Sequence, residues 1–410
     1  MKIIHTSDWH LGRYLNKTKK RYDEFSSFLE WLAKTIEERQ AEALIVAGDV
    51  FDNTTPTHRA QELYYSFLRQ VTVGTACCRH VVVVGGNHDS PSFLEAPSRL
   101  LRGLGVHVLG ASTGDPAREV LELRDLAGNL EMVVCAVPFL RESDLRLADL
   151  GESQDDRYRK TTQGLAAHYQ AVRDLAQEIV DRNPAGPVPV VGTGHLFLAG
   201  SSSQSDDGVR EIHAGPLEAL PLSVLPRFDY LALGHIHSPQ IVAKTETARY
   251  SGSPIPMGFN EAAQGKIVCL VDFGGDAPAV EPIRVPVFQE LRRLEGDLDS
   301  LVSQVKALGK TQAWLELVHT GSAAAGDIRG RLEKAAEGTG LEILTVRDNR
   351  LRDLAMAADD EILAISDLSL VAVFDRLLED HKIPEAERPP LQAAYSFLIS
   401  EIESQDVLAE

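Results

Sequence analysis

The chain has 410 residues, of which 44% are hydrophobic and 25% charged, and its formal net charge is -19. This length exceeds one compact core and predicts two or three domains, and no apolar stretch reaches the roughly 20 residues that span a bilayer. The N-terminus turns polar too early for a signal peptide, and the four cysteines form no CxxC pair or secreted-type framework, so we expect a cytoplasmic protein with reduced thiols.

The first 275 residues alternate short apolar runs with amphipathic segments. The runs are β-branched and bounded by Gly, Pro or Asn, which predicts buried strands at Ile3–Ile4, Ala43–Ala47, His80–Val84, Met132–Val137, Val188–Val191 and Tyr230–Leu233. Apolar residues at helical spacing predict helices at Arg21–Arg39, Arg59–Gln70 and Thr161–Asp181. Alternating strands and helices indicate a layered α/β domain.

The pattern changes after residue 275. The Gly- and Pro-rich run Gly274–Pro282 predicts a domain boundary. Behind it a βαβαβ order is predicted, with strands at Val287–Leu294, Ala313–Val318 and Leu341–Val346 and helices at Leu298–Leu308 and Asp327–Ala336. This order predicts a second, smaller α/β domain at residues 285–350.

Two amphipathic helices are predicted within residues 351–410. One apolar face contains Leu370, Val373, Phe374, Leu377 and Leu378, and the other contains Leu391, Tyr395, Leu398, Ile399 and Ile402. Two short helices cannot bury both faces completely against each other. The faces therefore either pack on the preceding domain or bind a partner.

The negative charge is concentrated in this C-terminal segment. Residues 351–410 contain 14 acidic and 4 basic residues, a net of -10, whereas the first 350 residues contain 46 acidic and 37 basic residues, a net of -9. The larger part of the chain is thus only mildly acidic, but it lacks the basic stripe expected of an autonomous DNA-binding protein. A polyanionic substrate would need another molecule to help hold it.

Five short motifs place metal-binding side chains directly after apolar runs. They are TSDWHLG with Asp8 and His10, AGDVFD with Asp49, GGNHD with Asn87 and His88, GTGHLF with His195, and LGHIH with His235 and His237. Loops after strands of an open α/β sheet gather at one edge. Carboxylate, imidazole and amide groups suit Mn²⁺, Fe²⁺ or Zn²⁺, and no thiolate is among them. The motifs therefore predict a site for two divalent metal ions.

A two-metal site is suited to the hydrolysis of phosphate esters. Two ions about 3.5–4 Å apart activate a bridging water and neutralise the phosphate oxygens. Asp49 is the natural bridging ligand, because Gly48 allows a sharp bend directly after an apolar run. Asp8 and His10 are two residues apart, so an extended loop would project both to one side, and the same holds for His235 and His237. A lone D-x-H or GD is a weak signal, whereas the ordered set of five is strong.

In this order the motifs resemble the calcineurin-like metallophosphoesterase superfamily. Within it SDWHLG, AGDVFD, VVGGNHD, GHLF and LGHIH, with the later segment YSGSPIPMGFNEAAQGK (Tyr250–Lys266), resemble the SbcD-type nuclease subunits of bacterial SbcCD complexes. The resemblance is strong over residues 1–270 and weak after about residue 285. It implies a four-layered α/β/β/α phosphoesterase core at residues 1–275, a small α/β capping domain at 285–350 and a C-terminal helix–loop–helix at 351–410.

The resemblance also implies roles for individual residues. One Mn²⁺ would bind Asp8, His10, Asp49 and His237, and the second would bind Asp49, Asn87, His195 and His235. His88 would face the scissile phosphate as the catalytic residue, oriented by Asp89. Asp52 departs from the pattern of some relatives, which carry a histidine there. His5 and His58 match no motif and are expected to be structural.

The implied function is that of a DNA nuclease working with an SbcC-like coiled-coil ATPase in DNA recombination, replication and repair. Such a subunit would have ATP-dependent double-strand exonuclease and single-strand or hairpin endonuclease activity, and would form a homodimer within a heterotetramer. The partner would contact the C-terminal helices through Leu370, Phe374, Leu377, Leu391, Tyr395 and Ile399. One alternative is a small-substrate phosphodiesterase or phosphatase, against which Tyr250–Lys266 and the last 125 residues argue. Another is a non-catalytic DNA-end scaffold, against which the complete ligand set argues.

Overall fold

The computed structural model describes residues 1–16, 18–74, 77–147, 152–199, 220–321 and 328–348, together with Arg388, Gln392 and Tyr395. Contacts group the chain into two compact units, Met1–Val318 with Ala324–Arg347, and His319–Ala323 with Asp348–Glu410. Apart from those three single residues, the C-terminal helices expected at 351–410 lie outside the described residues, so the partner surface stays a prediction. In the part of the chain that is described, no helix is long and apolar enough to cross a membrane.

The first sheet has six strands in the order β14-β13-β1-β4-β5-β6. Their bounds are β1 Lys2–Thr6, β4 Ala43–Ala47, β5 His80–Val84, β6 Val106–Leu109, β13 Ile267–Asp272 and β14 Ala279–Arg284. β1, β4, β5 and β6 are parallel, whereas β13 and β14 are antiparallel to their neighbours. The helices of this half are α1 Tyr22–Arg39, α2 His58–Arg69, α3 Pro91–Glu95 and α4 Ser98–Arg102.

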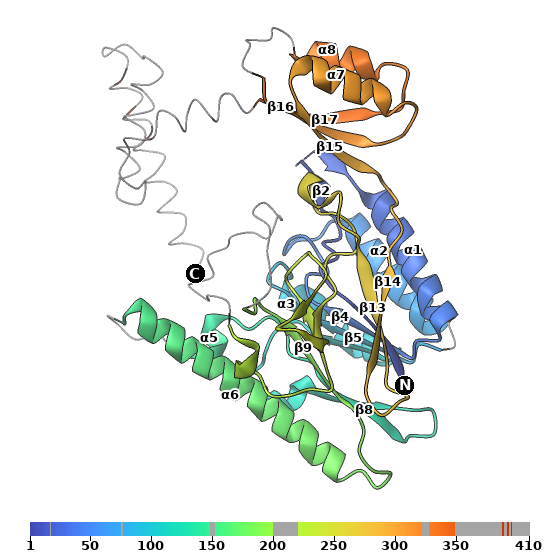
Figure 1. The fold of residues 1–410 in the computed structure, drawn as a ribbon. Coiled ribbons are helices and arrows are strands. Elements are labelled where there is room, and N and C mark those ends of the chain that lie inside the picture. Colours follow the sequence, from blue (N-terminus) through green and yellow to red (C-terminus); the bar gives the residue numbers. More distant parts are fainter. Residues whose placement is uncertain are drawn as a thin grey trace. The chain divides into compact units, whose positions relative to one another are not determined.

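The second sheet also has six strands, in the order β11-β12-β10-β9-β8-β7. Their bounds are β7 Val120–Arg124, β8 Leu130–Cys135, β9 Val190–His195, β10 Tyr230–Gly234, β11 Gln240–Val242 and β12 Thr245–Tyr250. β8, β9, β10 and β12 are parallel, and the two edge strands are antiparallel. The short α5 (Glu142–Leu145) precedes the long α6 (Gln154–Asp181), which runs along this sheet (Figure 1).

Neighbouring residues of each strand contact different layers. In β4, Leu44 packs with α1 and α2, whereas Ile45 faces the second sheet. In β8, Val133 packs with α6, whereas Val134 faces the first sheet. Because side chains alternate along a strand, a continuous apolar run such as ALIVA buries both faces of its sheet. The layer order is therefore α/β/β/α, which confirms the four-layered core.

The expected strands and helices of this core are present, with differences at their ends. β4 and β5 have the predicted bounds, whereas α6 begins at Gln154 instead of Thr161 because Ser153 caps it by accepting the N–H of Asp156 at 3.1 Å. β9 extends to His195, past the predicted end at Val191, so a predicted ligand lies in the strand itself. The sequence patterns did not predict β6, β7, β11 to β14 or the hairpin of β2 (Tyr14–Leu15) and β3 (Lys19–Lys20).

The run Gly274–Pro282 does not separate two domains. It forms most of the turn between β13 and β14 and continues into β14, which pairs with β13 as the edge strand of the first sheet. The first sheet thus extends to Arg284, beyond the expected end of the core at residue 275. The Gly and Pro residues mark a hairpin turn here, because these residue types are common in hairpin turns as well as in linkers between domains.

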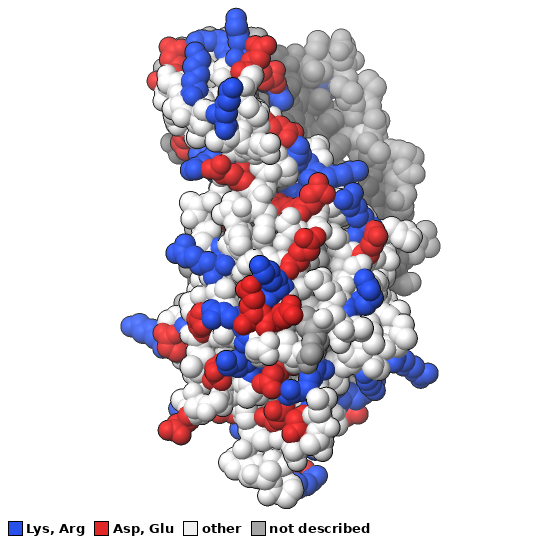
Figure 2. All heavy atoms as spheres, turned by 90° about the vertical axis from the view of Figure 1, so that its right-hand side faces the viewer, with Lys and Arg blue, Asp and Glu red and all other residues white. Residues whose placement is uncertain are grey.

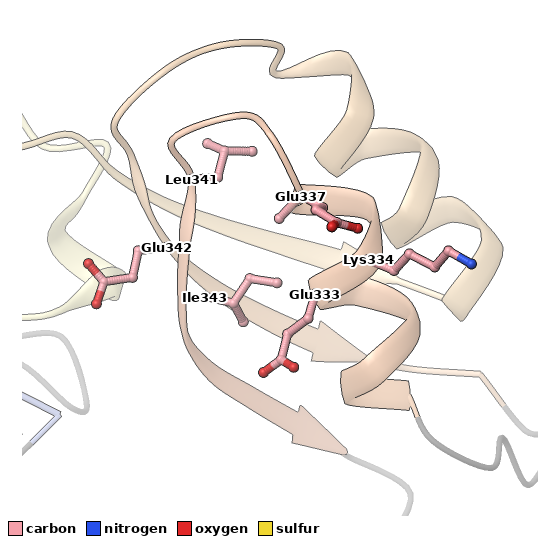
Figure 3. A pocket seen from close by; sticks show the side chains of 7 residues that line it. Glu333, Lys334, Glu337, Leu341, Glu342 and Ile343 are labelled. Atoms are coloured by element: carbon pink, nitrogen blue, oxygen red, sulfur yellow. The ribbon is translucent and has the colours of Figure 1, made fainter.

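The smaller α/β domain has the predicted βαβαβ order, coloured orange in Figure 1. Its elements are β15 Leu291–Gly296, α7 Leu298–Ala307, β16 Trp314–His319, α8 Ile328–Ala336 and β17 Glu342–Asp348, with sheet order β15-β16-β17. Leu301, Leu315 and Leu332 belong to its own apolar core. A groove of about 470 Å³ between α8 and β17 is lined by Glu333, Lys334, Ala336, Glu337, Leu341, Glu342 and Ile343 (Figure 3). None of the predicted site residues lines this groove.

Candidate metal centre

The eight predicted site residues lie at the carboxyl ends of parallel strands from both sheets. Asp8 and His10 follow β1, Asp49 follows β4, Asn87 and His88 follow β5, His195 ends β9, and His235 and His237 follow β10. The first sheet thus supplies five of these residues and the second sheet three. Side chains that are far apart in the sequence meet because the two sheets are stacked with these strand ends together.

The loops after β1 and β4 remain paired beyond the regular sheet. The N–H of Asp8 donates to the carbonyl of Gly48 at 3.0 Å, and the N–H of His10 donates to the carbonyl of Asp49, also at 3.0 Å. The N–H of Leu11 continues the series to the Val50 carbonyl at 2.9 Å. This extended ladder fixes the two loops side by side.

Four of the predicted ligands have a left-handed backbone. The φ angles are 54° at Asp8, 47° at His10, 51° at Asp49 and 97° at His235. This corrects the expectation that Asp8 and His10 lie on an extended loop. A left-handed conformation costs a non-glycine residue on the order of 1–2 kcal/mol, and such strain persists where the surrounding structure enforces it, commonly at functional sites.

Two glycines allow the strand ends to approach each other. Gly48 has a φ of +91°, and a Cβ at this position would lie 2.2 Å from Nδ1 of His195. A Cβ at Gly86 would lie 2.1 Å from Oδ1 of Asp49. Gly48 and Gly86 therefore provide space for His195 and Asp49, respectively, and Gly48 also provides the freedom to bend.

Asn87 is at the centre of one group of donor atoms. Its Oδ1 lies 3.0 Å from Nε2 of His195 and 3.1 Å from Nδ1 of His235. Nε2 of His195 is also 3.3 Å from Oδ2 of Asp49. Nδ1 of His195 donates to the main-chain carbonyl of Ala47 at 2.9 Å, which leaves Nε2 directed into the site.

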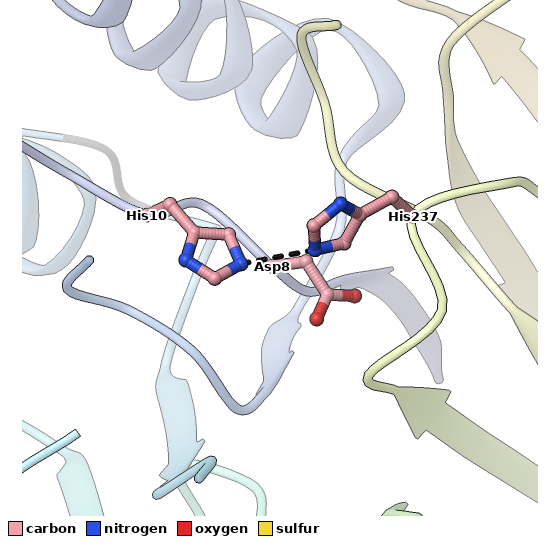
Figure 4. A group of neighbouring side chains, drawn as sticks. All are labelled: Asp8, His10 and His237. Carbon is pink, nitrogen blue, oxygen red and sulfur yellow. Dashed lines mark hydrogen bonds between the residues drawn. The ribbon is translucent and has the colours of Figure 1, made fainter. Parts of the chain in front are cut away.

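A second group contains Asp8, His10 and His237 (Figure 4). Nε2 of His10 lies 3.1 Å from Nε2 of His237 and 3.6 Å from Oδ2 of Asp49. Asp8 belongs to two clusters, one with His10 and His237 and the other with Asp49 and His195. Within each cluster the donor atoms lie within 4.8 Å of one another. The two groups therefore meet at Asp49, the predicted bridge.

His88 lies beside these groups and is held by Asp52. Its Nδ1 donates to the main-chain carbonyl of Asp52 at 2.9 Å, and its ring is edge-on to His10 with 4.8 Å between centroids. The Asp52 carboxylate lies 3.5 Å from Nδ1 of His10 and pairs with Arg13 at 3.1 Å. The sequence analysis did not predict this role of Asp52, which contacts both His88 and His10.

Asp89 does not orient His88, contrary to expectation. Its carboxylate accepts main-chain N–H groups from Gly86 at 2.9 Å, Val50 at 3.1 Å and Phe51 at 2.9 Å. It therefore ties the loop after β5 to the loop after β4. Of the two histidines expected to be structural, His5 bonds to the Tyr230 hydroxyl at 2.9 Å and His58 is exposed at the start of α2.

Burial and charge set the ionisation of the donors. Burial would raise the pKa of Asp49, but His195, His10 and His88 hold it well below its usual range. Burial would lower the pKa of His195, but the Asp49 carboxylate raises it to about 9. Burial lowers the pKa of His10 to about 4 and that of His235 to about 3. At neutral pH Asp49 is therefore ionised and His10 and His235 are neutral, the states that bind a cation, whereas His195 is protonated and must release its proton when a cation binds.

These residues fit divalent cations. Donor atoms at right angles around an ion at about 2.1 Å lie about 3 Å from each other, which is close to the separations around Asn87 and between His10 and His237. The donor set of carboxylate, amide and imidazole groups suits Mn²⁺, Fe²⁺ or Zn²⁺.

Two charged residues from the Tyr250–Lys266 segment also reach this site. Oε1 of Glu261 lies 3.4 Å from Nδ1 of His237, and Nζ of Lys266 donates to the His237 carbonyl at 3.0 Å. Burial would raise the pKa of Glu261, but His237 and Lys266 lower it to about 2, so the carboxylate is ionised. The sequence drew attention to this segment without assigning a role to either residue. The available signal was a Glu and a Lys within an otherwise uncharged stretch.

Comparisons with known proteins agree with this geometry. The model of the calcineurin-like phosphoesterase family matches residues 1–239, and that of the type 5 capsule protein repressor C-terminal domain matches residues 287–382. The SbcD subunit of the SbcCD nuclease from Escherichia coli K12 is 36% identical over 402 residues, 97% of each chain. The same subunit from Rhodobacter capsulatus is 38% identical over 70% of each chain. That from Bacillus subtilis is 30% identical over 77% of this chain and 75% of the relative.

Proposed function

Because the chain belongs to the calcineurin-like phosphoesterase family, and within it to the SbcD nuclease subunits, we propose that it is the metal-dependent nuclease subunit of an SbcCD-type complex. The observation that carries this proposal is the convergence of donors from both sheets around Asp49, with His88 beside them. The alternatives of a small-substrate phosphatase and a non-catalytic scaffold receive no support from a specific observation.

The proposed ligands fall into two sets that share Asp49. Asp8, His10 and His237 form one set with it, and Asn87, His195 and His235 form the other. Mn²⁺ is the proposed metal because the resemblance to SbcD-type subunits implies it, and the donor set, which is borderline to hard and includes no thiolate, accepts it as it would Fe²⁺ or Zn²⁺. When bound, two such ions activate water and neutralise charge on the phosphate.

His88 is proposed to act on the leaving oxygen. Its Nδ1–H is committed to the Asp52 carbonyl, so Nε2 is the nitrogen left to donate a proton or a hydrogen bond to the substrate. The Asp52 carbonyl fixes the ring, while the Asp52 carboxylate lies near His10 and Arg13. Asp52 thereby positions a proposed metal ligand and the proposed catalytic residue together.

The proposed substrate is DNA at ends and hairpins, held largely with an SbcC-like coiled-coil ATPase. On the face shown in Figure 2, Lys and Arg side chains are interspersed with Asp and Glu, so this face has no broad basic surface for a nucleic acid. Together with the mildly acidic composition of the first 350 residues, this face is consistent with a substrate held mainly by a partner. ATP-dependent exonuclease and hairpin endonuclease activity, action in the cytoplasm, and a homodimer within a heterotetramer belong to the same proposal.

The test uses the full chain with and without its coexpressed ATPase. The substrates are a hairpin DNA and bis-p-nitrophenyl phosphate, each with added Mn²⁺. We expect Mn²⁺-dependent cleavage of the hairpin, and its loss in Asp49→Ala together with both bound ions. Hydrolysis of the small ester without any DNA cleavage, in either the free or the assembled protein, would refute the nuclease assignment. Metal-replete Asp49→Ala protein that still cuts DNA would refute the site.

A further inference from the structure

A buried ion pair lies directly behind the proposed ligand His237. Glu261 is fully buried and Lys266 is 5% exposed, and their charged groups are in contact. Oε1 of Glu261 lies 3.4 Å from Nδ1 of His237, whereas Nε2 of the same ring lies 3.1 Å from Nε2 of His10. The imidazole therefore stands between this carboxylate and the donor cluster.

The two oxygens of Glu261 have different surroundings. Oε2 accepts hydrogen bonds from Lys266, from the main-chain N–H of Met257 at 3.0 Å and from the Ser253 hydroxyl at 3.3 Å. Oε1 is buried and accepts no hydrogen bond of good geometry from the part of the chain that the structure describes. A buried carboxylate oxygen is costly without a donor, and the Nδ1–H of His237 is the donor placed to meet it.

Lys266 holds both the carboxylate and the backbone of the proposed ligand. Its Nζ donates to the His237 carbonyl at 3.0 Å and to the Ser253 hydroxyl at 3.0 Å, in addition to Glu261. An unpaired carboxylate at this depth would cost several kcal/mol. Lys266 therefore allows an ionised Glu261 to be kept behind the ring.

A short, well-packed turn carries Glu261 to this position. Glu261 ends the 3-10 turn η4 (Phe259–Glu261), and Phe259 at its start is buried in an apolar cluster with Leu15 and Leu291. Leu15 belongs to the β2–β3 hairpin and Leu291 to the smaller domain. The turn is thus anchored on one side by apolar packing and presents its carboxylate on the other.

We propose that Glu261 and Lys266 are a positioning pair for His237. Glu261 accepts the Nδ1–H, which fixes the tautomer whose Nε2 lone pair is directed at the metal site, and Lys266 fixes both Glu261 and the His237 backbone. His195 and His88 are oriented by neutral main-chain carbonyls, whereas His237 has an anionic acceptor, which makes its Nε2 a stronger ligand. The inference rests on the proposed function, in which His237 binds metal.

The experiment compares Glu261→Gln with a matched control, Glu119→Gln. Glu119 is 1% exposed, and its Oε2 lies 2.7 Å from Nε2 of His168. The two residues form a carboxylate–histidine pair outside the donor cluster. Binding of Mn²⁺ to EDTA-treated full-length protein is measured by calorimetry. The tautomer of His237 is read from ¹⁵N-histidine NMR spectra of the metal-free protein. A double variant, Glu261→Met with Lys266→Met, removes both charges at once and avoids a lone buried ion.

We expect Glu261→Gln and the double variant to weaken one of two Mn²⁺ sites by about 10- to 100-fold, and the His237 signals to change from one tautomer to a mixture. Glu119→Gln should leave both measurements unchanged. Wild-type Mn²⁺ affinity and a single tautomer in the double variant would overturn the proposal. His237→Ala separates the proposed ligand role of His237 from the proposed positioning role of Glu261 and Lys266. If His237→Ala still binds two Mn²⁺, the ligand assignment fails. If it loses a site that the double variant retains, only the positioning role fails.

Discussion

Replacing Gly48 by alanine tests whether the strand ends are held together as the structure indicates. Gly48 has a φ of +91°, and its Cβ would lie 2.2 Å from Nδ1 of His195. The substitution therefore has two consequences, strain in the backbone and displacement of a proposed ligand. Gly128 has a φ of +87°, and a Cβ there would meet no atom of the described residues within 4 Å, so Gly128→Ala introduces the strain alone.

The two effects can be given magnitudes. A left-handed alanine costs about 1–2 kcal/mol at either position. At Gly48 the His195 ring must also move, which breaks its bond to the Ala47 carbonyl and leaves a buried polar group unpaired at a cost of about 1–3 kcal/mol. We therefore expect Gly48→Ala to be less stable than Gly128→Ala by about 1–3 kcal/mol.

The assay has two parts, urea unfolding of the EDTA-treated proteins and calorimetric titration with Mn²⁺. Gly128→Ala should bind Mn²⁺ like the wild type. Gly48→Ala should lose about 10- to 100-fold in affinity at the site that contains His195, since the support of a ligand is removed. Equal stability and equal Mn²⁺ affinity in the two variants would refute the close approach of Gly48 to His195.

Three further predictions concern other parts of the chain. His88→Ala should keep two bound Mn²⁺ while hairpin cleavage falls by about 10²- to 10⁴-fold, and a loss of metal instead would make His88 a ligand. Burial lowers the pKa of His5 from 6.5 to about 3 in the folded protein. As the pH falls below 6.5, His5 therefore becomes protonated in the unfolded chain but not in the folded protein, and the free energy of unfolding decreases. Urea unfolding should therefore show that the free energy of unfolding decreases between pH 7 and pH 5 by about 2 kcal/mol less in His5→Gln than in the wild type. An equal decrease in both proteins would contradict this. Truncation after Asn349 should abolish copurification with the ATPase but preserve hydrolysis of bis-p-nitrophenyl phosphate, and continued copurification would refute the proposed partner surface.

The sequence patterns by themselves determined a layered α/β core and the candidate ligands, because both are encoded in short segments, whereas the four-layered arrangement followed from the family resemblance. The run ALIVA, followed by Gly48 and Asp49, contains a strand buried on both faces, a bend and a carboxylate within seven residues. The edge strands β7, β11 and β14 were missed because exposed or short strands have little apolar periodicity. The turn before β14 was misread for a related reason, since Gly and Pro mark hairpins and linkers alike.

Only the tertiary structure decided how these residues act on one another. The bond from His195 to the Ala47 carbonyl spans 148 residues of sequence, and the contact of His237 with Glu261 joins a strand end to a distant turn. The role of Asp52 depends on its carbonyl, whose direction no side-chain pattern encodes. A ligand's identity is local chemistry that a motif can reveal, whereas its orientation depends on groups that packing brings together from remote parts of the chain.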